Sequence, residues 1–121
     1  MLAPIPVRLS IPFPPSTNRL WRHWQGRTLI SKEGRAYRTA VATAVAVARP
    51  ESFGRAPVRL TIAAWMPDSR RRDLDNLLKA TQDALGAARL YEDDSQIVDL
   101  RIRRAGLDRA RPRLEIQLEA A

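Results

Sequence analysis

Hydrophobic residues recur at two different spacings along this chain, and these spacings limit the folds that it can adopt. Four segments alternate apolar and polar residues with a period of two, which predicts strands that bury one face. They lie at Val7–Phe13, Val58–Met66, Val98–Arg103 and Arg113–Glu119. Two other segments, Tyr37–Ala48 and Leu74–Ala88, repeat apolar residues at helical spacing. The order strand, helix, strand, helix, strand, strand predicts a two-layer α+β domain, in which two helices cover one face of a four-stranded mixed or antiparallel sheet.

The ends of the helices follow from their capping residues. Ser31 is the expected N-cap of the first helix, and Asp73 is the expected N-cap of the second, which ends near Leu90. The Pro, Gly and Arg content of residues 49–57 and 104–112 predicts loops.

The composition narrows the class of protein further. A length of 121 residues is enough for one hydrophobic core, so we expect residues 1–121 to form a single domain. No apolar run approaches the roughly 20 residues that span a bilayer. The N-terminus lacks the pattern of a signal peptide, and the chain has no cysteine. We therefore expect a cytoplasmic protein that has no contact with membranes.

The acidic residues gather in one stretch of a basic chain. The net charge is +8, yet eight of the 13 Asp and Glu residues lie between Asp68 and Asp99. Carboxylates that lie close together repel one another unless a positive charge is among them. A divalent metal ion supplies such a charge, and it is the cation that phosphodiester hydrolysis uses. Because His23 is the only histidine, a metal site here must use carboxylates.

Asp73 and Asp75 are placed to share one end of the second helix. A capping residue is extended, so the two carboxylates can converge there, although residues i and i+2 inside a helix do not share a face. The partial positive charge of the helix N-terminus favours both. Lys79, four residues after Asp75, projects over the same region. The Asp93-Asp94 pair joins this group only if the turn that follows the helix folds back on the helix start.

The basic charge is almost entirely arginine. Lys32 and Lys79 are the only lysines among 21 basic residues, which leaves 19 arginines. Arginine binds phosphate in a bidentate manner, and the sequence pI of about 11.3 is typical of a nucleic-acid-binding protein. A compositional bias towards arginine explains part of this choice but not the net charge. The expected DNA contacts are Arg70, Arg71 and Arg72, with Asn18, Arg19, Arg22 and Arg27 upstream.

Each acidic feature also has a simpler interpretation. Asp73 can be an ordinary helix cap, and the Asp93-Asp94 pair can be a solvated turn. Asp75 and Lys79 can form a plain surface ion pair.

Other residues are expected to be structural or to contact DNA. We expect Asp99, on the polar face of a strand, to be structural, and His23 to lie at the surface or contact DNA. Of Trp21 and Trp24, one is expected in the core, whereas the other can stack on an unpaired base. Trp65 is expected in packing or in an interface.

Five motifs are weak signals singly, but together they are specific for one protein family. They are Pro14-Pro15-Ser16-x-Asn18-Arg19, Gly26-Arg27-Thr28-x-Ile30-Ser31-x-Glu33-Gly34-x-Ala36-Tyr37-Arg38, Arg71-Arg72-Asp73-Leu74-Asp75-Asn76-Leu77-x-Lys79-Ala80, Asp83-Ala84-Leu85, and Asp93-Asp94-x-Gln96-Ile97-Val98. In sequence and spacing the chain resembles the RusA-type Holliday junction resolvases over nearly its whole length.

The resemblance implies a homodimeric endodeoxyribonuclease that depends on Mg²⁺, with Mn²⁺ as a possible substitute, and that cuts four-way DNA junctions symmetrically. It implies that Asp73, Asp75 and Asp94 are the catalytic acids and metal ligands, and that Lys79 is the essential basic residue. Asp93 corresponds to an adjacent acid, which we include among the expected ligands. No small-molecule cofactor is implied.

Two other functions are open at this point. The chain can be a Mg²⁺-dependent nuclease of other branched DNA, which shares the site but not the substrate. It can also be a non-catalytic nucleic-acid-binding module whose acids hold a structural ion. Cleavage of a synthetic junction with and without Mg²⁺ distinguishes the three.

Overall fold

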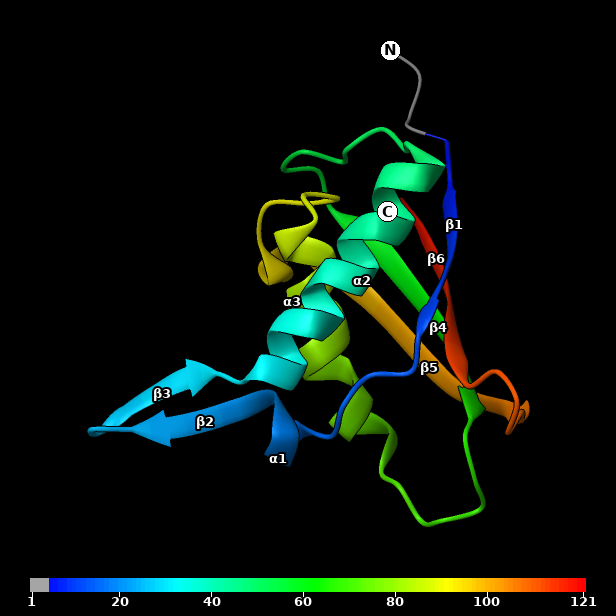
Figure 1. The fold of residues 1–121 in the computed structure, drawn as a ribbon. Coiled ribbons are helices and arrows are strands. Elements are labelled where there is room, and N and C mark those ends of the chain that lie inside the picture. Colours follow the sequence, from blue (N-terminus) through cyan, green and yellow to red (C-terminus); the bar gives the residue numbers. More distant parts are fainter. Residues whose placement is uncertain (1–4) are drawn as a thin grey trace.

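The computed structural model describes residues 5–121 and is built on a four-stranded sheet (Figure 1). Its strands are β1 (Val7–Pro12), β4 (Val58–Met66), β5 (Ile97–Leu107) and β6 (Arg113–Ala120). They lie in the order β1-β6-β4-β5. β6 is antiparallel to both of its neighbours, whereas β5 runs parallel to β4. The sheet is therefore mixed, which confirms the prediction.

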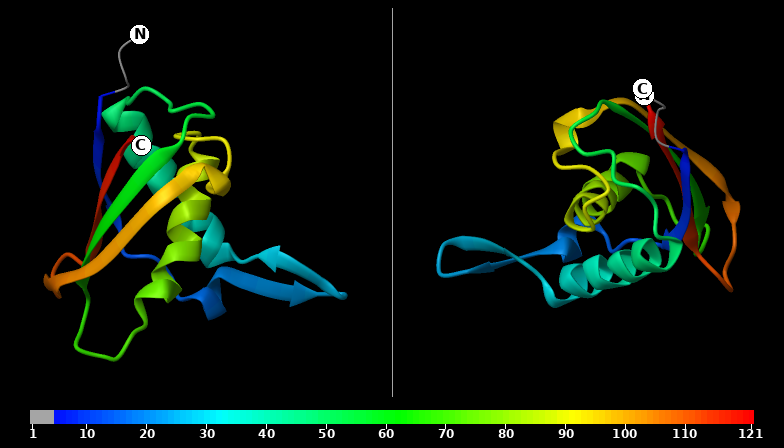
Figure 2. Two further views of the ribbon diagram at one scale, coloured as in Figure 1. Left: turned by 180° about the vertical axis from the view of Figure 1, so that it is seen from behind. Right: turned by 90° about the horizontal axis from the view of Figure 1, so that it is seen from above.

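Two long helices cover one face of this sheet. They are α2 (Lys32–Ala48) and α3 (Leu78–Ala87), and the view from above shows both on the same side of the curved sheet (Figure 2). The predicted two-layer α+β architecture is confirmed. Ser31 is the N-cap of α2, since its side chain accepts a hydrogen bond from the Gly34 amide at 3.0 Å.

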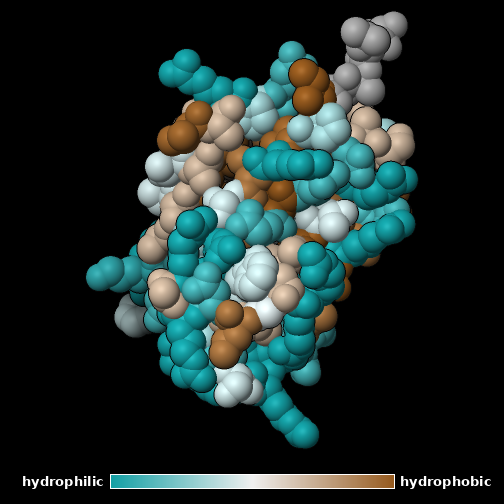
Figure 3. Space-filling view, turned by 90° about the vertical axis from the view of Figure 1, so that its right-hand side faces the viewer, coloured by the Kyte–Doolittle hydropathy of each residue, from teal (hydrophilic) through white to brown (hydrophobic). Residues whose placement is uncertain are grey.

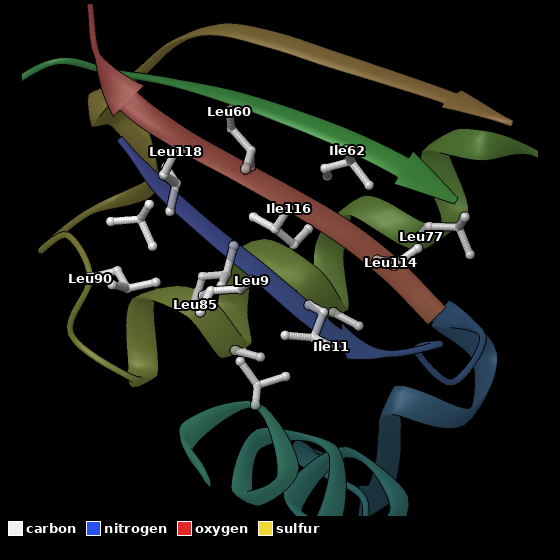
Figure 4. Packing of buried hydrophobic residues seen from close by; sticks show 14 of the residues in the cluster. Leu9, Ile11, Leu60, Ile62, Leu77, Leu85, Leu90, Leu114, Ile116 and Leu118 are labelled. Carbon is white, nitrogen blue, oxygen red and sulfur yellow. The ribbon is translucent and has the colours of Figure 1, made fainter. Parts of the chain in front are cut away.

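The core lies between the sheet and the helices (Figure 4). The period-two residues of β1, β4 and β6 point into it, as predicted from the alternation. For β5 the prediction is wrong at Val98 and Leu100, which are 63% and 39% exposed because this strand lies at the edge of the sheet. Among its most buried side chains are Ile11, Leu60, Ile62, Leu114 and Leu118 from the sheet, and Val41 and Leu85 from the helices. Tyr37 of α2 adds a polar link, because its hydroxyl donates to the Pro12 carbonyl oxygen at 3.0 Å.

The other face of the sheet is charged. Figure 3 shows the side of the molecule on which the sheet lies in Figure 1, and hydrophilic side chains predominate there. Arg59 on β4 pairs with Asp99 on β5 at 2.9 Å and with Glu119 on β6 at 3.7 Å. These pairs agree with the structural role expected of Asp99.

Several element boundaries differ from the sequence prediction. The predicted loop at 104–112 is wrong in its first part, because β5 continues to Leu107, which pairs with Met66 of β4. The ladder to β4 overrides the loop-like composition of these residues. The second helix ends at Ala87 rather than near Leu90, since Arg89 adopts a left-handed conformation with φ of 66°.

Some short elements were not predicted. They are α1 (Thr17–Leu20), the strands β2 (Trp21–Trp24) and β3 (Arg27–Ile30), and the 3₁₀ helix η2 (Asp94–Gln96). The helix predicted from Leu74 is present, but its first turn is the 3₁₀ helix η1 (Leu74–Leu77). β2 and β3 form a separate two-stranded sheet. Within residues 5–121, no helix is both long and apolar enough to cross a membrane.

The packing of α3 leads to a first prediction. Leu85 is fully buried, so Leu85→Ala should lower the free energy of unfolding by about 2–5 kcal/mol through lost contacts and a cavity. Val47 on α2 is 79% exposed, and Val47→Ala should change it by no more than about 0.5 kcal/mol. Urea denaturation measures both values. Equal effects of the two substitutions would show that α3 is not packed on the sheet.

Candidate active site

The loop between β4 and η1 is held by Arg72. Its guanidinium makes a two-pronged pair with Asp68, in which Nη1 donates to Oδ1 and Nη2 donates to Oδ2 at 3.1 Å. The same guanidinium lies 5.6 Å from the ring centre of Phe13. The carbonyl oxygen of Arg72 accepts a hydrogen bond from Arg104 of β5. These contacts fix the residue that directly precedes Asp73.

The pairing of Asp68 with Arg72 changes the carboxyl group's acidity. The hydrogen bond from Arg72, followed by that from the Arg70 amide, lowers the pKa of Asp68 from 3.8 to about 2. Asp68 is therefore ionised at neutral pH. Its role is to hold the loop through Arg72, and it is not a candidate for proton transfer.

Asp73 begins the helical segment without capping it. Its backbone is extended, with φ of −78° and ψ of 133°, as expected of an N-cap. Its side chain makes no capping hydrogen bond, so the interpretation as an ordinary cap is wrong. Asp75, in η1, and Lys79, in the first turn of α3, are both exposed. Within residues 5–121 these two side chains form no ion pair with each other.

A hollow of about 640 Å³ lies beside Asp73. It brings together five of the seven residues predicted to contact DNA, with two acids among them. They are Asn18, Arg19, Arg70, Arg71, Arg72, Glu33 and Asp73. Arg22 and Arg27 do not line it. Four arginines face two carboxylates, so the hollow is cationic. Arg70 and Arg71 are exposed, whereas Arg72 is engaged with Asp68.

A second, smaller hollow of about 270 Å³ lies beside the C-terminal half of α3. It is lined by acids, with one arginine among them: Arg38, Asp83, Glu92, Asp93 and Asp94. Arg38 of α2 forms an ion pair with Asp83 of α3, with Nη2 and Oδ2 2.7 Å apart. This hollow is therefore acidic overall.

Asp93 organises the turn that carries Asp94. Its carboxylate accepts hydrogen bonds from the amide and the hydroxyl of Ser95, which lower the pKa of Asp93. Gln96 completes the capping box, because its Oε1 accepts from the Asp93 amide at 2.8 Å. The Gln96 Nε2 donates to the carbonyl oxygens of Gly54 and Ala56 at 2.8 and 2.9 Å. The turn is thus held by hydrogen bonds, although Asp93 and Asp94 are exposed to solvent as the simpler interpretation expected.

Asp94 lies against the end of α3, not against its start. Its Oδ1 is 3.9 Å from the position that a Cβ on Gly86 would occupy. It is also near the hydroxyl of Tyr91, which donates to the Gln82 carbonyl oxygen at 2.7 Å. Burial, followed by the charge of Asp94, raises the pKa of Tyr91. The turn therefore folds back on α3, but onto its last turn.

The acids of one chain consequently lie in two places. Across residues 5–121, no three His, Cys, Asp or Glu side chains come together in the manner of a metal site. Carboxylates are the right donors for a hard divalent cation, but those of a single chain do not fit a complete site. The roles of Asp73, Asp75, Asp93, Asp94 and Lys79 stay predictions.

The ion pairs nevertheless divide the acids into two sets. Of the eight acids between Asp68 and Asp99, half are paired with arginine: Asp68, Asp83, Glu92 and Asp99. The other half have no ion pair in the part of the chain that the structure describes: Asp73, Asp75, Asp93 and Asp94. The second set is the set predicted to bind metal. In a protein of net charge +8, unpaired carboxylates are left to attract a cation of another kind.

Sequence reasoning missed the pair of Arg38 and Asp83. A signal for it was present, since Asp83 follows Lys79 and Asp75 at intervals of four residues and so continues one face of the helix. Arg38 belongs to a motif that was quoted, but the distance of 45 residues between the two gave no indication that they meet.

A family model described as Endodeoxyribonuclease RusA matches residues 12–119. This chain is also similar to three proteins named crossover junction endodeoxyribonuclease RusA. They come from Escherichia coli (strain K12), Enterobacteria phage 82 and Shigella sonnei (strain Ss046). Each is 49% identical over 94 residues, which cover 78% of this chain and 78% of the relative.

The Arg72–Asp68 pair gives a prediction about pH. Removing the guanidinium in Arg72→Ala should raise the pKa of Asp68 from about 2 towards 3.8. Because the folded-state pKa is the lower one, ionised Asp68 stabilises the fold above about pH 4, and this contribution is lost as the pH falls towards 2. Carboxyl ¹³C shifts measured against pH report the change. The pKa of Asp108, which Arg113 lowers, is the internal control and should not move; an unchanged Asp68 would show that the pair does not form in solution.

Proposed function

The chain belongs to the RusA family of endodeoxyribonucleases, which hydrolyse DNA phosphodiester bonds, and from this we propose that it resolves four-way DNA junctions by paired cuts on opposed strands, with Mg²⁺ as its cofactor and Mn²⁺ as a substitute. The observation that carries the proposal is the set of acids without arginine partners. All four of these acids are at motif positions, and one of them, Asp73, lies in a hollow with four arginines.

The arginines of this hollow supply the attraction for DNA. Arg19, Arg70 and Arg71 are exposed, and each guanidinium can hold two phosphate oxygens at once. Arg72 has a structural role instead. Its hydrogen bonds to Asp68 and its contact with Phe13 hold the loop on which Arg70 and Arg71 lie. DNA drawn to these groups has its backbone beside Asp73.

The acids and Lys79 serve the cleavage step. A divalent cation, when bound, supplies a water of lowered pKa and neutralises charge on the reacting phosphate. Asp73 and Asp75 offer oxygen ligands at the start of the helical segment, where the partial positive charge of the helix favours anions. Lys79 is a fixed cation near this end and opposes the negative charge that develops on the phosphate. The further oxygens must come from elsewhere, such as DNA phosphate, a moved Asp94 or a second chain.

The acids are tested by charge-neutral replacement. Asp73→Asn, Asp75→Asn and Asp94→Asn should each slow cleavage of a synthetic four-way junction at least about 100-fold, the loss typical of removing one group that stabilises a transition state. Junction binding should persist, since removing negative charge does not weaken attraction to phosphate. Asp108→Asn, which breaks the ion pair with Arg113 outside both hollows, is the matched control and should cut normally.

The same assay separates the alternatives. Cleavage of flaps but not of four-way junctions indicates a nuclease of other branched DNA. Binding without cleavage in Mg²⁺ or Mn²⁺ indicates a non-catalytic module. Near wild-type cleavage by one of the three Asn variants removes that residue from the site.

A homodimer is part of the proposal. A four-way junction has near two-fold symmetry, and two symmetric cuts require two sites, which a C2 dimer provides. β5 offers a self-complementary edge, because within the described residues it pairs with β4 only. Val98 and Leu100 are 63% and 39% exposed there. Antiparallel pairing about an axis through Leu100 places Val98 opposite Ile102 and Asp99 opposite Arg101, so that apolar meets apolar and acid meets base.

Assembly gives the next prediction. Light scattering at assay concentrations should show a dimer, and Leu100→Arg should convert it to a monomer because two like charges then meet at the axis. Val47→Arg, which places the same charge on the exposed surface of α2, should remain dimeric. A wild-type monomer that still makes paired cuts would contradict the dimer and favour the nuclease of other branched DNA.

A further inference from the structure

β2 and β3 form an arm that stands apart from the rest of the molecule. They pair only with each other among the described residues, and they project away from the helices and the sheet in all the ribbon views (Figures 1 and 2). Gln25 and Gly26 turn the chain between them with φ of 49° and 73°, which is typical of a type I′ hairpin turn. No atom lies within 4 Å of a Cβ placed on Gly26, so the tip is free.

The base of the arm is fixed to α2. The amide of Ser31 donates to the Leu20 carbonyl oxygen at 2.9 Å, and its hydroxyl donates to the Arg19 carbonyl oxygen at 2.5 Å. Leu20 is buried. Gly34 of α2 fits so closely that a Cβ there would be 2.8 Å from the Leu20 carbonyl oxygen. The arm is therefore a hairpin whose base is anchored to the rest of the molecule.

One face of the arm carries an aromatic side chain between two arginines. Trp24 is paired with Arg27 across the hairpin, and paired residues share a face. Arg22 lies two residues before Trp24 and so shares that face too. Trp24 is 59% exposed, whereas Trp21, on the opposite face, packs against the core. Among the large hydrophobic side chains exposed in residues 5–121, Trp24 is the only aromatic one.

The charge of the arm points to a polyanion. No acid occurs from Phe13 to Lys32, a stretch that contains Arg19, Arg22 and Arg27. A second copy of a chain of net charge +8 repels such an arm, whereas DNA attracts it. Arg19 at the base also lines the hollow that contains Asp73, so the arm rises from the rim of the candidate site. Each strand has four residues, which gives a reach of about 13 Å.

We propose that this arm recognises the branch of the DNA: the indole of Trp24 stacks on a base that is exposed where the strands exchange, and Arg22 and Arg27 bind the phosphates on either side. The inference rests on the proposed function and deepens it by naming the feature of the substrate that is selected. In a continuous duplex each base is covered by its neighbours, so an exposed indole gains a stacking partner only where bases are unstacked. Such stacking is tolerant of sequence.

The test compares the affinities of a four-way junction, a gapped duplex with unpaired bases and a continuous duplex. Trp24→Ala should weaken junction binding about tenfold and duplex binding by less than about twofold, since one stacked base is lost. Trp24→Phe should restore most of the junction affinity. Arg70→Ala combined with Arg71→Ala should instead weaken binding to junction and duplex alike, because it removes phosphate contacts. The melting temperature should not change in either Trp24 variant, as Trp24 lies outside the core.

Each outcome decides one of the two claims. If the wild-type protein binds and cuts the gapped duplex but not the junction, the proposed function is overturned. In that case, a selective loss of gapped-duplex binding in Trp24→Ala still supports the proposed role of the arm. Equal junction and gapped-duplex binding by Trp24→Ala and wild-type protein overturns the inference. It is also overturned if light scattering shows that Trp24→Ala is a monomer where the wild type is a dimer, since the arm then contacts a second copy.

Discussion

The pairing of carboxylates with arginine is the interaction on which the arrangement of the acids in this molecule depends most. Arg59 with Asp99 links two strands, Arg38 with Asp83 links the two long helices, and Arg72 with Asp68 shapes the loop before η1. Each is at least partly exposed, so each adds little stability alone. Their importance is positional, because they occupy the structural acids and leave Asp73, Asp75 and Asp94 without an ion pair within residues 5–121. A basic chain thus keeps a few carboxylates available for a metal ion.

Separate hollows for Asp73 and Asp94 follow from the geometry of α3. The helix is 10 residues long, or about 15 Å at its rise per residue, and Asp94 lies beside Gly86 near its end. Asp75, Lys79 and Asp83 occur at intervals of four residues between the two ends, so charges of alternating sign follow one face of the helical segment. Lys79 lies between Asp75 and Asp83, which would otherwise repel each other. Asp73 and Asp94 need a cation or a second chain before they can act together.

The sheet and the two long helices could be predicted because each has a strong hydrophobic period and a clear cap, as at Ser31. The hairpin could not, because its apolar residues show no clear period. Trp21 packs against the core, whereas Trp24 is 59% exposed and half of the residues of β2 and β3 are polar. Its turn, Gln25-Gly26, is also a weaker signal than Asn-Gly. The acids at Asp73 and Asp94 could be chosen from their motifs, but their separation depends on where the turn docks. That docking is set by contacts of Gln96 with Gly54 and Ala56, which are remote in sequence.

In the proposed function, affinity and selectivity for DNA have different physical sources. Guanidinium groups attract any phosphate backbone, so Arg19, Arg70 and Arg71 favour duplex and branched DNA alike. A nuclease that relied on them alone would bind mostly to continuous duplex, which is far more abundant than branches. Selectivity must come from a group whose gain in free energy exists only at a branch. An exposed indole on a projecting arm meets this requirement, because it gains little against stacked bases and more against an unstacked one. The anchored base also matters, since an arm already held at Ser31 and Gly34 has less conformational entropy to lose when it binds.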